Sequence, residues 1–325
     1  MGDDTDSVGA MRDRAPGRIA WWAALLAIIG IGVAFAARIT GIEDGALAVA
    51  VAMVPWFTLA CLVPLAIALL LRAWALAGVA GLLLALGLVW IAPLYTAADA
   101  GDDVALTVAA ANVTFGLGDA GQVVALVRDN DVDLLVLTEL TPESRDALRA
   151  AGLDAELPFG EVRAQPSFNG TGLWSRFPLE SAAGLDGFVS QTIEARVATP
   201  QGTVTVFAVH PPAPGPTYHP RWSADLARLH GVLAAAHGPI LVAGDFNTTR
   251  DHRAFRDFEA LGYVNAADEA GAGFQPTFPQ GRRTPPVVAI DHVLTKDAPW
   301  VATGLERHVI DRSDHFAIVV TYAAR

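Results

Sequence analysis

The sequence predicts an α+β fold, a four-layer α/β/β/α sandwich preceded by three transmembrane α-helices. Many short apolar runs of strand type follow one another with few helical segments between them, which indicates two packed sheets with helices outside. Hydrophobic residues make up 53% of the chain, somewhat above the usual share in globular proteins. Their excess is concentrated before residue 93, which indicates a separate membrane part.

Three uncharged apolar segments form the predicted membrane part, at residues 19–37, 46–71 and 73–92. Each has roughly the 20 residues that a helix needs to cross the hydrocarbon core of a bilayer. Pro55 and Pro64 in the second segment are tolerable because neighbouring helices can satisfy the freed carbonyl groups. An alternative for the first segment is a signal peptide, since Ala34-Phe35-Ala36 resembles a small-residue cleavage site.

Basic residues beside these segments predict the orientation in the membrane. Arg12, Arg14 and Arg18 precede the first segment, and Arg72 lies in the link between the second and third. Basic residues near membrane helices favour the cytoplasmic side. We therefore expect a multi-pass protein of the cytoplasmic membrane, with a cytoplasmic segment at residues 1–18, a membrane region at 19–95 and an extracytoplasmic domain at 103–325.

Charge and cysteine content restrict the function of that domain. The formal net charge of the chain is −12, and acidic residues also outnumber basic ones after residue 100. Binding to duplex DNA draws mainly on Lys and Arg that neutralise phosphates, so the sequence disfavours nucleic acid as a partner. Cys61 is the single cysteine and lies in a predicted span, which leaves the domain without a disulfide or a thiolate metal site.

Strand-like and helix-like segments of the domain alternate along the chain. A helix that begins at residue 141 has Thr141 as its N-cap, and a later helix carries its apolar residues on one face. We predict helices over residues 119–129, 141–151 and 219–236, and strands over residues 104–113, 132–140, 170–174, 188–199, 204–210, 240–243, 287–294 and 316–321.

Polar side chains stand at the ends of several of these apolar strands. One polar residue after a strand usually marks a turn. When several strands each end in Asn, Asp, Glu or His, the repetition indicates that these side chains belong to one site. Carboxylates can hold a hard cation, which polarises a phosphoryl group, and a histidine held by an aspartate can take a proton from water. An amide can donate to a phosphoryl oxygen as charge builds. The residues are Asn112, Glu139, His210, Asp245, Asn247, Asp291, Asp314 and His315.

The segments that contain these residues resemble, in order, those of the endonuclease/exonuclease/phosphatase superfamily, which includes pancreatic deoxyribonuclease, apurinic endonucleases, sphingomyelinases and inositol-polyphosphate phosphatases. The resemblance covers about residues 104–321 and implies that residues 103–325 are a catalytic domain. The matching segments are AANV from Ala110, DLLVLTEL from Asp133, GTGLWSRFPL from Gly170, VFAVHPP from Val206, ILVAGDFNTT from Ile240, AIDHVLT from Ala289 and RSDHFAIVV from Arg312.

The resemblance implies a divalent metal, Mg²⁺ or Mn²⁺, and a set of ligands for it. Glu139 corresponds to the principal ligand with Asn112 beside it, and Asp314 to an additional ligand. Many members place Asn or Asp two residues after the asparagine, where this chain has Thr114. That departure weakens the case for a second metal ion at this corner of the site.

The resemblance also implies the catalytic roles. Asp245 and Asn247 match the pair that binds or orients the nucleophilic water and the phosphate. His315 resembles the general base, or alternatively a phosphate-binding histidine, and Asp291 would orient it. His210 matches a second histidine that assists the leaving group in the deoxyribonuclease-like branch. All five residues are therefore catalytic candidates.

Three spans followed by an external domain resemble the VanJ-type membrane proteins, which are linked with glycopeptide-antibiotic resistance and thought to act on lipid-linked pyrophosphates. The sequence thus predicts a membrane-anchored phosphoesterase that acts on a phosphorylated lipid, with no obligatory protein partner. An extracellular nuclease and a catalytically inactive sensor or antibiotic-binding module are the alternatives, and retention of every candidate residue argues against the inactive module. Arg282 and Arg283 could grip an anionic head group or lie in a solvated loop.

Overall fold

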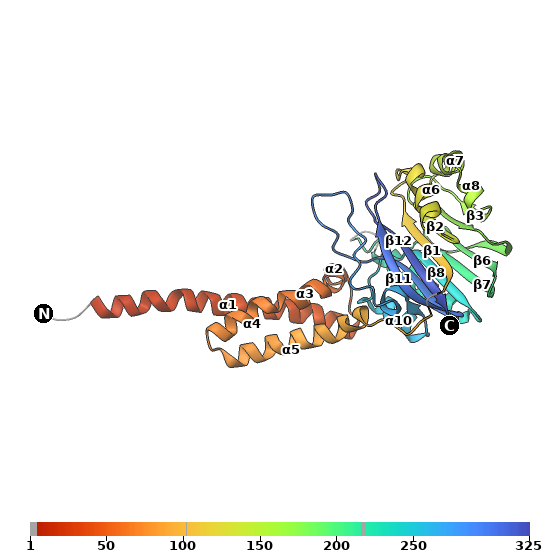
Figure 1. Ribbon diagram of the computed structural model, residues 1–325. Helices are drawn as coiled ribbons and strands as arrows, with labels where there is room; N and C mark the ends of the chain where they lie inside the picture. The colour runs from red at the N-terminus through yellow and green to blue at the C-terminus, as the bar shows by residue number, and fades with distance from the viewer. Residues whose placement is uncertain (1–4, 102, 216–218) are drawn as a thin grey trace. The chain divides into compact units, whose positions relative to one another are not determined.

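The computed structural model describes residues 5–101, 103–215 and 219–325 (Figure 1). Side chains are described from Gly17 onward. The chain divides into two compact units, Met1–Ala92 and Pro93–Arg325. Residues 1–4 of the predicted cytoplasmic segment lie outside the described residues, as do residues 102 and 216–218.

The first unit consists of apolar helices. Two stretches, Gly17–Thr40 and Trp74–Tyr95, are long and apolar enough to cross a membrane. Between them, the pair Ala46–Ala52 and Val54–Leu70 meets the same test only when it is counted as one span, and it bends by 67°. The expectation of three spans is therefore confirmed only as two to three apolar helices. The helices are α1 (Thr5–Thr40), α2 (Ala46–Ala52), α3 (Val54–Ala60), α4 (Leu62–Leu70) and α5 (Trp74–Ile91).

The bend in the middle segment begins at Met53, whose φ of −91° and ψ of 5° depart from helical values between α2 and α3. Pro55 follows in the first turn of α3, where proline is tolerated because the missing N–H has no intrahelical partner there. Small residues allow close helix packing in this unit. At Gly87 of α5, a Cβ atom would lie only 2.2 Å from Thr58 Oγ1 of α3.

The second unit contains, within the described residues, two six-stranded sheets. The first has the order β11 (Trp300–His308), β12 (Ala317–Ala324), β1 (Val104–Asn112), β2 (Leu134–Thr138), β4 (Thr171–Ser175) and β3 (Phe159–Arg163). The second has the order β5 (Leu179–Leu185), β6 (Thr192–Thr199), β7 (Gly202–Val209), β8 (Ile240–Asp245), β10 (Asp291–Lys296) and β9 (Val264–Asn265). The pairs β1–β2 and β7–β8 are parallel, and the other pairs are antiparallel.

The core of the second unit follows from strands buried on both faces. Ala109, Leu135 and Leu137 pack in one cluster with residues of the helices α6 (Ala120–Asp129), α7 (Pro142–Ala151) and α8 (Leu153–Glu156). Side chains alternate along a strand, so Leu134 and Val136 point to the opposite face, and both are fully buried. Strands β1 and β2 contact β8 of the second sheet. The predicted α+β sandwich of two sheets is therefore confirmed.

Helices α9 (His219–Ala235) and α10 (Arg253–Ala260) pack at the end of β8. Phe246, which directly follows β8, contacts Phe255 and Phe258 of α10. The predicted apolar face of α9 is buried, and α7 begins at Thr141 with a capping box that includes Ser144. The remaining short elements are η1 (Ala92–Tyr95) and α11 (Ala266–Glu269).

Some predicted strand bounds were wrong. Four strands that the sequence did not predict, β3, β5, β9 and β11, are edge strands of the two sheets in the described part of the chain. The strand predicted over residues 287–294 begins at Asp291, and only an isolated bridge between Phe278 and Val288 precedes it. The strand predicted over residues 188–199 begins at Thr192.

Candidate active site

Strand register brings the predicted polar residues to one end of the sandwich. In the first sheet Asn112 pairs with Thr138, which places Glu139 next to Asn112. In the second sheet Asp245 pairs directly with Asp291. The two sheets meet where Asn112 Nδ2 donates a hydrogen bond of 3.0 Å to Asp245 Oδ2. The strand ends therefore form a single site.

Glu139 lies in a strained turn that directs its carboxylate toward Asn112. Its φ of 57° is in the left-handed region, where a non-glycine residue costs roughly 1–3 kcal/mol and is often found at functional sites. Glu139 Oε1 accepts a hydrogen bond of 3.0 Å from Asn112 Nδ2, and Oε2 accepts one of 2.7 Å from the backbone N–H of Phe115. Both oxygens are thus oriented by neighbouring donors.

Asn112 bridges two carboxylates. Its Nδ2 donates to both Glu139 and Asp245, and its Oδ1 accepts a hydrogen bond of 2.8 Å from the backbone N–H of Thr114. The side chain is buried, with 1% of the residue exposed. In this arrangement its nitrogen, and not its oxygen, faces the carboxylates, so its role as a metal ligand stays a prediction.

The turn that contains Asp245 and Asn247 is closed by hydrogen bonds within the protein. Asn247 N–H donates to Asp245 Oδ1 at 2.8 Å, and Asn247 Nδ2 donates to the carbonyl of Pro211 at 3.0 Å. Asn247 also has a positive φ of 46°. Gly244 allows the strand to reach this turn, because a Cβ atom there would lie 2.1 Å from the carbonyl oxygen of Val209. The turn holds Asp245 in place.

Trp222 supports the same turn from α9. Its Nε1 donates a hydrogen bond of 3.0 Å to the carbonyl oxygen of Asn247. The sequence indicated Trp222 only as part of an apolar helix face. The N–H of a buried tryptophan usually has a hydrogen-bond partner, so the sequence indicated that Trp222 has one but not which residue it is.

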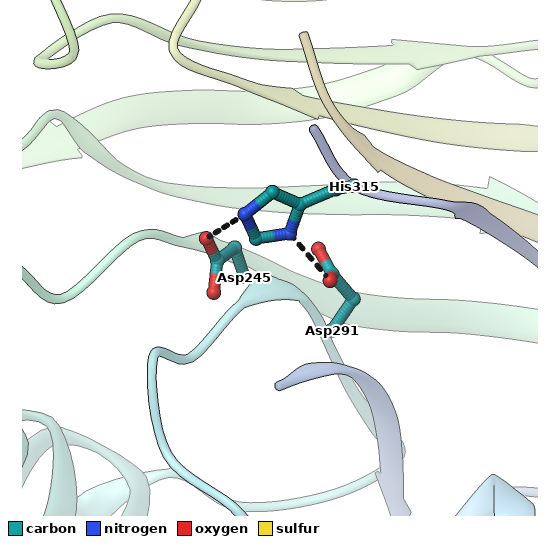
Figure 2. Close-up of side chains that lie close together, drawn as sticks. All are labelled: Asp245, Asp291 and His315. Atoms are coloured by element: carbon teal, nitrogen blue, oxygen red, sulfur yellow. Dashed lines mark hydrogen bonds and ion pairs between the residues drawn. The ribbon is translucent and has the colours of Figure 1, made fainter. Parts of the chain in front are cut away.

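A histidine lies between two aspartates at the centre of the site. His315 Nδ1 is 2.8 Å from Asp291 Oδ2, and His315 Nε2 is 3.8 Å from Asp245 Oδ2. Figure 2 shows the two carboxylates on either side of the imidazole ring. His210 approaches the same oxygen, with its Nε2 3.6 Å from Asp245 Oδ2. All four residues are buried.

Burial and neighbouring charges set different protonation states within this group. Burial opposes the charge of His315, but Asp291 and Asp245 outweigh it and raise the pKa of His315 to about 10. Burial and the charge of Asp291 raise the pKa of Asp245 to about 6. Burial lowers the pKa of His210. At neutral pH, His315 is therefore cationic, His210 is neutral and Asp245 is ionised.

Asp314 lies at the edge of this group with both carboxylate oxygens already bonded. Its Oδ1 accepts a hydrogen bond of 2.7 Å from the hydroxyl of Thr114 and is 4.0 Å from His315 Nε2. Its Oδ2 is 2.6 Å from Arg282 Nη2. Thr114, the departure from the family pattern noted in the sequence, thus binds Asp314. The role of Asp314 as a metal ligand stays a prediction.

Ser313 connects the two ends of the site and was missed by the sequence analysis. Its hydroxyl donates to the carbonyl oxygen of Asn112 at 2.7 Å and accepts from the backbone N–H of His315 at 3.0 Å. A serine between Arg312 and Asp314 carries no signal for such a role in one sequence.

The chemistry of the donors fits a divalent metal ion. Asp245, Asp291 and His315 have potential ligand atoms within 4.8 Å of one another. Asp291 Oδ1 is buried and has no hydrogen-bond partner among the described residues. Burial also raises the pKa of Glu139. A hard cation stabilises buried carboxylates that repel one another. The carboxylate oxygens are therefore better metal ligands here than His315, whose Nδ1 is already bonded to Asp291.

A sandwich of two sheets with carboxylates, amides and a buried Asp–His pair at its strand ends defines a class of hydrolase that acts on phosphate esters. The sequence matches the Endonuclease/Exonuclease/phosphatase family over residues 109–315. The chain therefore belongs to this family, whose members include phosphoesterases and nucleases. The resemblance drawn from the sequence motifs is confirmed at this level.

Solved structures agree on the fold. An endonuclease/exonuclease/phosphatase from Bacteroides vulgatus is 17% identical, covers 68% of this chain and 99% of its own, and has a TM-score of 0.56. Humanized D. rerio TDP2 with 14 mutations is 14% identical, with coverage of 67% and 99% and a TM-score of 0.55. An AP endonuclease from Archaeoglobus fulgidus is 18% identical, with coverage of 66% and 98% and a TM-score of 0.55. The search of curated proteins found no match.

Proposed function

We propose that this protein is a membrane-anchored, divalent-metal-dependent phosphoesterase that hydrolyses a phosphate ester or pyrophosphate bond of a lipid-linked substrate. The observation that carries the proposal is the buried group of Asp245, Asp291 and His315, connected to Glu139 through Asn112. Glu139, with Asp314 as an additional ligand, would hold Mg²⁺ or Mn²⁺. When bound, such an ion polarises the phosphoryl group and stabilises the leaving oxygen.

The pKa values favour a phosphate-binding role for His315. A histidine with a pKa of about 10 keeps its proton at neutral pH, so its Nε2–H is a donor for a phosphoryl oxygen. Asp291 accepts from Nδ1 and fixes the orientation of the ring. Of the two roles that the family resemblance leaves open for His315, we therefore propose the second.

Asp245 is the proposed base. Its pKa of about 6 is close to the working pH, where a general base is most effective, and the turn at Asn247 fixes its position. In the proposed step, water attacks phosphorus, its proton passes to Asp245, and the bond from phosphorus to the leaving oxygen breaks. The leaving oxygen takes its proton from solvent, and His210, which is neutral and faces Asp245, is the candidate for a hydrogen bond that assists the leaving group.

The apolar helices support a lipid substrate. Two to three helices are long and apolar enough to cross a membrane, and as spans they would confine the chain to the bilayer, where lipid phosphates are concentrated. The net charge of −12 supports a substrate other than duplex DNA. We further propose three spans in the VanJ-like layout, with the catalytic unit on the outer face of the cytoplasmic membrane, because the basic residues favour that orientation.

A tethered nuclease is the second candidate. Two of the similar structures are an AP endonuclease and a D. rerio TDP2 complexed with a single-strand DNA product. A local basic surface or a bound metal ion could offset the acidic charge of the chain. This candidate uses the same site and differs only in substrate.

A substrate panel separates the two candidates. Full-length protein in detergent is incubated with Mg²⁺ or Mn²⁺ and a prenyl diphosphate, a sphingomyelin-like lipid or plasmid DNA, and released phosphate, released head group and nicking are measured. The proposal expects metal-dependent turnover of a lipid that is abolished in Asp245→Ala. Plasmid nicking that is lost in His315→Ala, with no lipid turnover, would establish the nuclease instead.

A further inference from the structure

Residues 278–282 form the start of a loop that is fixed against the segment containing Asp314 and His315. The backbone N–H of Gln280 donates to the carbonyl oxygen of Asp314 at 2.7 Å. The backbone N–H of Phe316 donates to the carbonyl oxygen of Thr277 at 2.8 Å. These two bonds place the first residues of the loop beside the catalytic group.

Arg282 is the basic residue that this loop brings to the site. Its Nη2 is 2.6 Å from Asp314 Oδ2, and its guanidinium carbon lies 5.6 Å from the centre of the Phe278 ring. The Phe278 ring is in turn 5.0 Å from the ring of His315. Arg282 is therefore held by one ion pair and one aromatic face, at the rim of the site.

The side chain of Arg282 retains hydrogen-bonding capacity. It is 58% exposed, and a guanidinium carries five N–H donors, so its contact with Asp314 leaves donors directed to solvent. Asp314 is itself fixed by Thr114 through its other oxygen. An arginine held in this way is suited to bind two oxygens of one phosphate group.

We infer that Arg282 is a substrate-binding residue that binds the anionic oxygens of a phosphate group of the substrate, and that Asp314 is the residue that positions it. This inference rests on the proposed function, and it narrows the substrate to one with a phosphate that carries two negative charges, such as a diphosphate or a phosphomonoester. The phosphate of a phosphodiester carries a single negative charge, so it should bind the guanidinium of Arg282 more weakly than a phosphate with two charges does.

Anion binding tests the inference without any turnover. Full-length protein in detergent with Mg²⁺ is titrated with inorganic phosphate and inorganic pyrophosphate in a calorimeter. Arg282→Met should weaken binding by about ten- to hundred-fold, the range expected for a lost charge-assisted hydrogen bond. Arg282→Lys should recover part of the loss. Arg283→Met is the matched control, because Arg283 is the exposed neighbour, and it should bind as the wild type does.

Three results of the anion titration would contradict a substrate-binding role for Arg282. Equal affinity of Arg282→Met and the wild type overturns the inference, as does an equal loss in Arg283→Met, which would indicate only a diffuse effect of charge. Lack of binding of either anion to the wild type also overturns it. Unchanged near-ultraviolet circular dichroism and unfolding temperature establish that the variants are folded.

Once a substrate that the protein hydrolyses is known, steady-state kinetics of Arg282→Met provide a second test. Arg282→Met should raise KM by about ten-fold or more while kcat changes by less than about three-fold, since ground-state and transition-state binding are lost together. A loss of kcat with an unchanged KM contradicts a role in substrate binding. If the wild type hydrolyses no phosphoester, the proposed function fails, while the anion titration still decides the role of Arg282.

Discussion

Asn112 of the first sheet donates a hydrogen bond of 3.0 Å to Asp245 at the end of the second sheet. This bond joins the two sheets at the site and stabilises the ionised form of Asp245, so it lowers the pKa of a group that burial raises. The same nitrogen donates to Glu139. One amide thus controls the position and the acidity of two carboxylates.

Replacing Asn112 should therefore shift the acid limb of the pH–rate profile. In Asn112→Ala the lost donor raises the pKa of Asp245 above its value of about 6, so activity should be lost at a higher pH than in the wild type. Stability should fall by about 1–3 kcal/mol, because the buried carboxylate of Asp245 and the half-buried carboxylate of Glu139 lose a donor. Measurements of kcat/KM against pH and of denaturant unfolding check both effects. An acid limb at the wild-type position would contradict the role given to Asn112.

Replacing Asp291 should shift the alkaline limb. His315 must be protonated to donate to the phosphate, so wild-type activity should fall as the pH rises through about 10. In Asp291→Asn a negative charge that raises the pKa of His315 is gone, and activity should fall at a lower pH. The profile of kcat/KM between pH 6 and pH 11 measures this shift. An alkaline limb that moves to higher pH, or that is unchanged, would show that protonated His315 is not the group that binds the phosphate.

Replacing Gly244 should destabilise the end of β8. A Cβ atom in Gly244→Ala would meet the carbonyl oxygen of Val209 at 2.1 Å, and the backbone φ of 142° is unfavourable for alanine. We expect a loss of about 1–3 kcal/mol from overpacking and strain, together with most of the activity. Gly304→Ala is the matched control, because a Cβ atom on residue 304 would have no other atom within 4 Å. Equal unfolding free energies for the two variants would contradict the packing argument.

The stability of the second unit should fall at alkaline pH because of Tyr263. Burial and the charge of Asp297 raise the pKa of Tyr263 to about 12 in the folded protein, above the usual value near 10. The stabilising contribution is therefore complete below about pH 10 and is lost as the pH rises through about 12. In Tyr263→Phe, unfolding should depend less on pH in this window.

At neutral pH, Tyr263→Phe should cost about 0.5–1.5 kcal/mol, because its hydroxyl donates a hydrogen bond of 3.0 Å to the carbonyl oxygen of Leu233. Tyr95→Phe serves as the control, since Tyr95 is 65% exposed. Denaturant unfolding of the full chain between pH 7 and pH 12 measures both quantities. Tyr95→Phe should keep the wild-type dependence on pH; if Tyr263→Phe keeps it as well, Tyr263 is not the responsible group.

The central strands and the polar residues at their ends could be predicted from the sequence. Leu134 and Val136 are buried on one face of the first sheet and Leu135 and Leu137 on the other, so β2 is a continuous apolar run that stops before Glu139. The edge strands could not be predicted in the same way. Strand β11 carries the exposed Glu306 and the half-buried Arg307, and such charges on an edge strand interrupt the apolar pattern.

Contacts between loops that are far apart in the chain could not be predicted from the sequence either. Arg282 and Asp314 are 32 residues apart, and their ion pair depends on how residues 278–282 fold back onto the segment around His315. For this reason the sequence could not distinguish a solvated loop from a binding residue at Arg282. The direction of the Asn112 amide and the bond from Trp222 to Asn247 depend on side-chain geometry in the same way.

The bond from Ser313 to Asn112 has a consequence for biosynthesis, since it joins residues that are 201 positions apart in the chain. Strand β1 pairs with β12, so the candidate catalytic group remains in pieces until both strands have left the ribosome. Contacts of such long range also slow folding. A chain that ends before Ser313 lacks both this bond and the imidazole of His315, and we therefore expect it to be inactive.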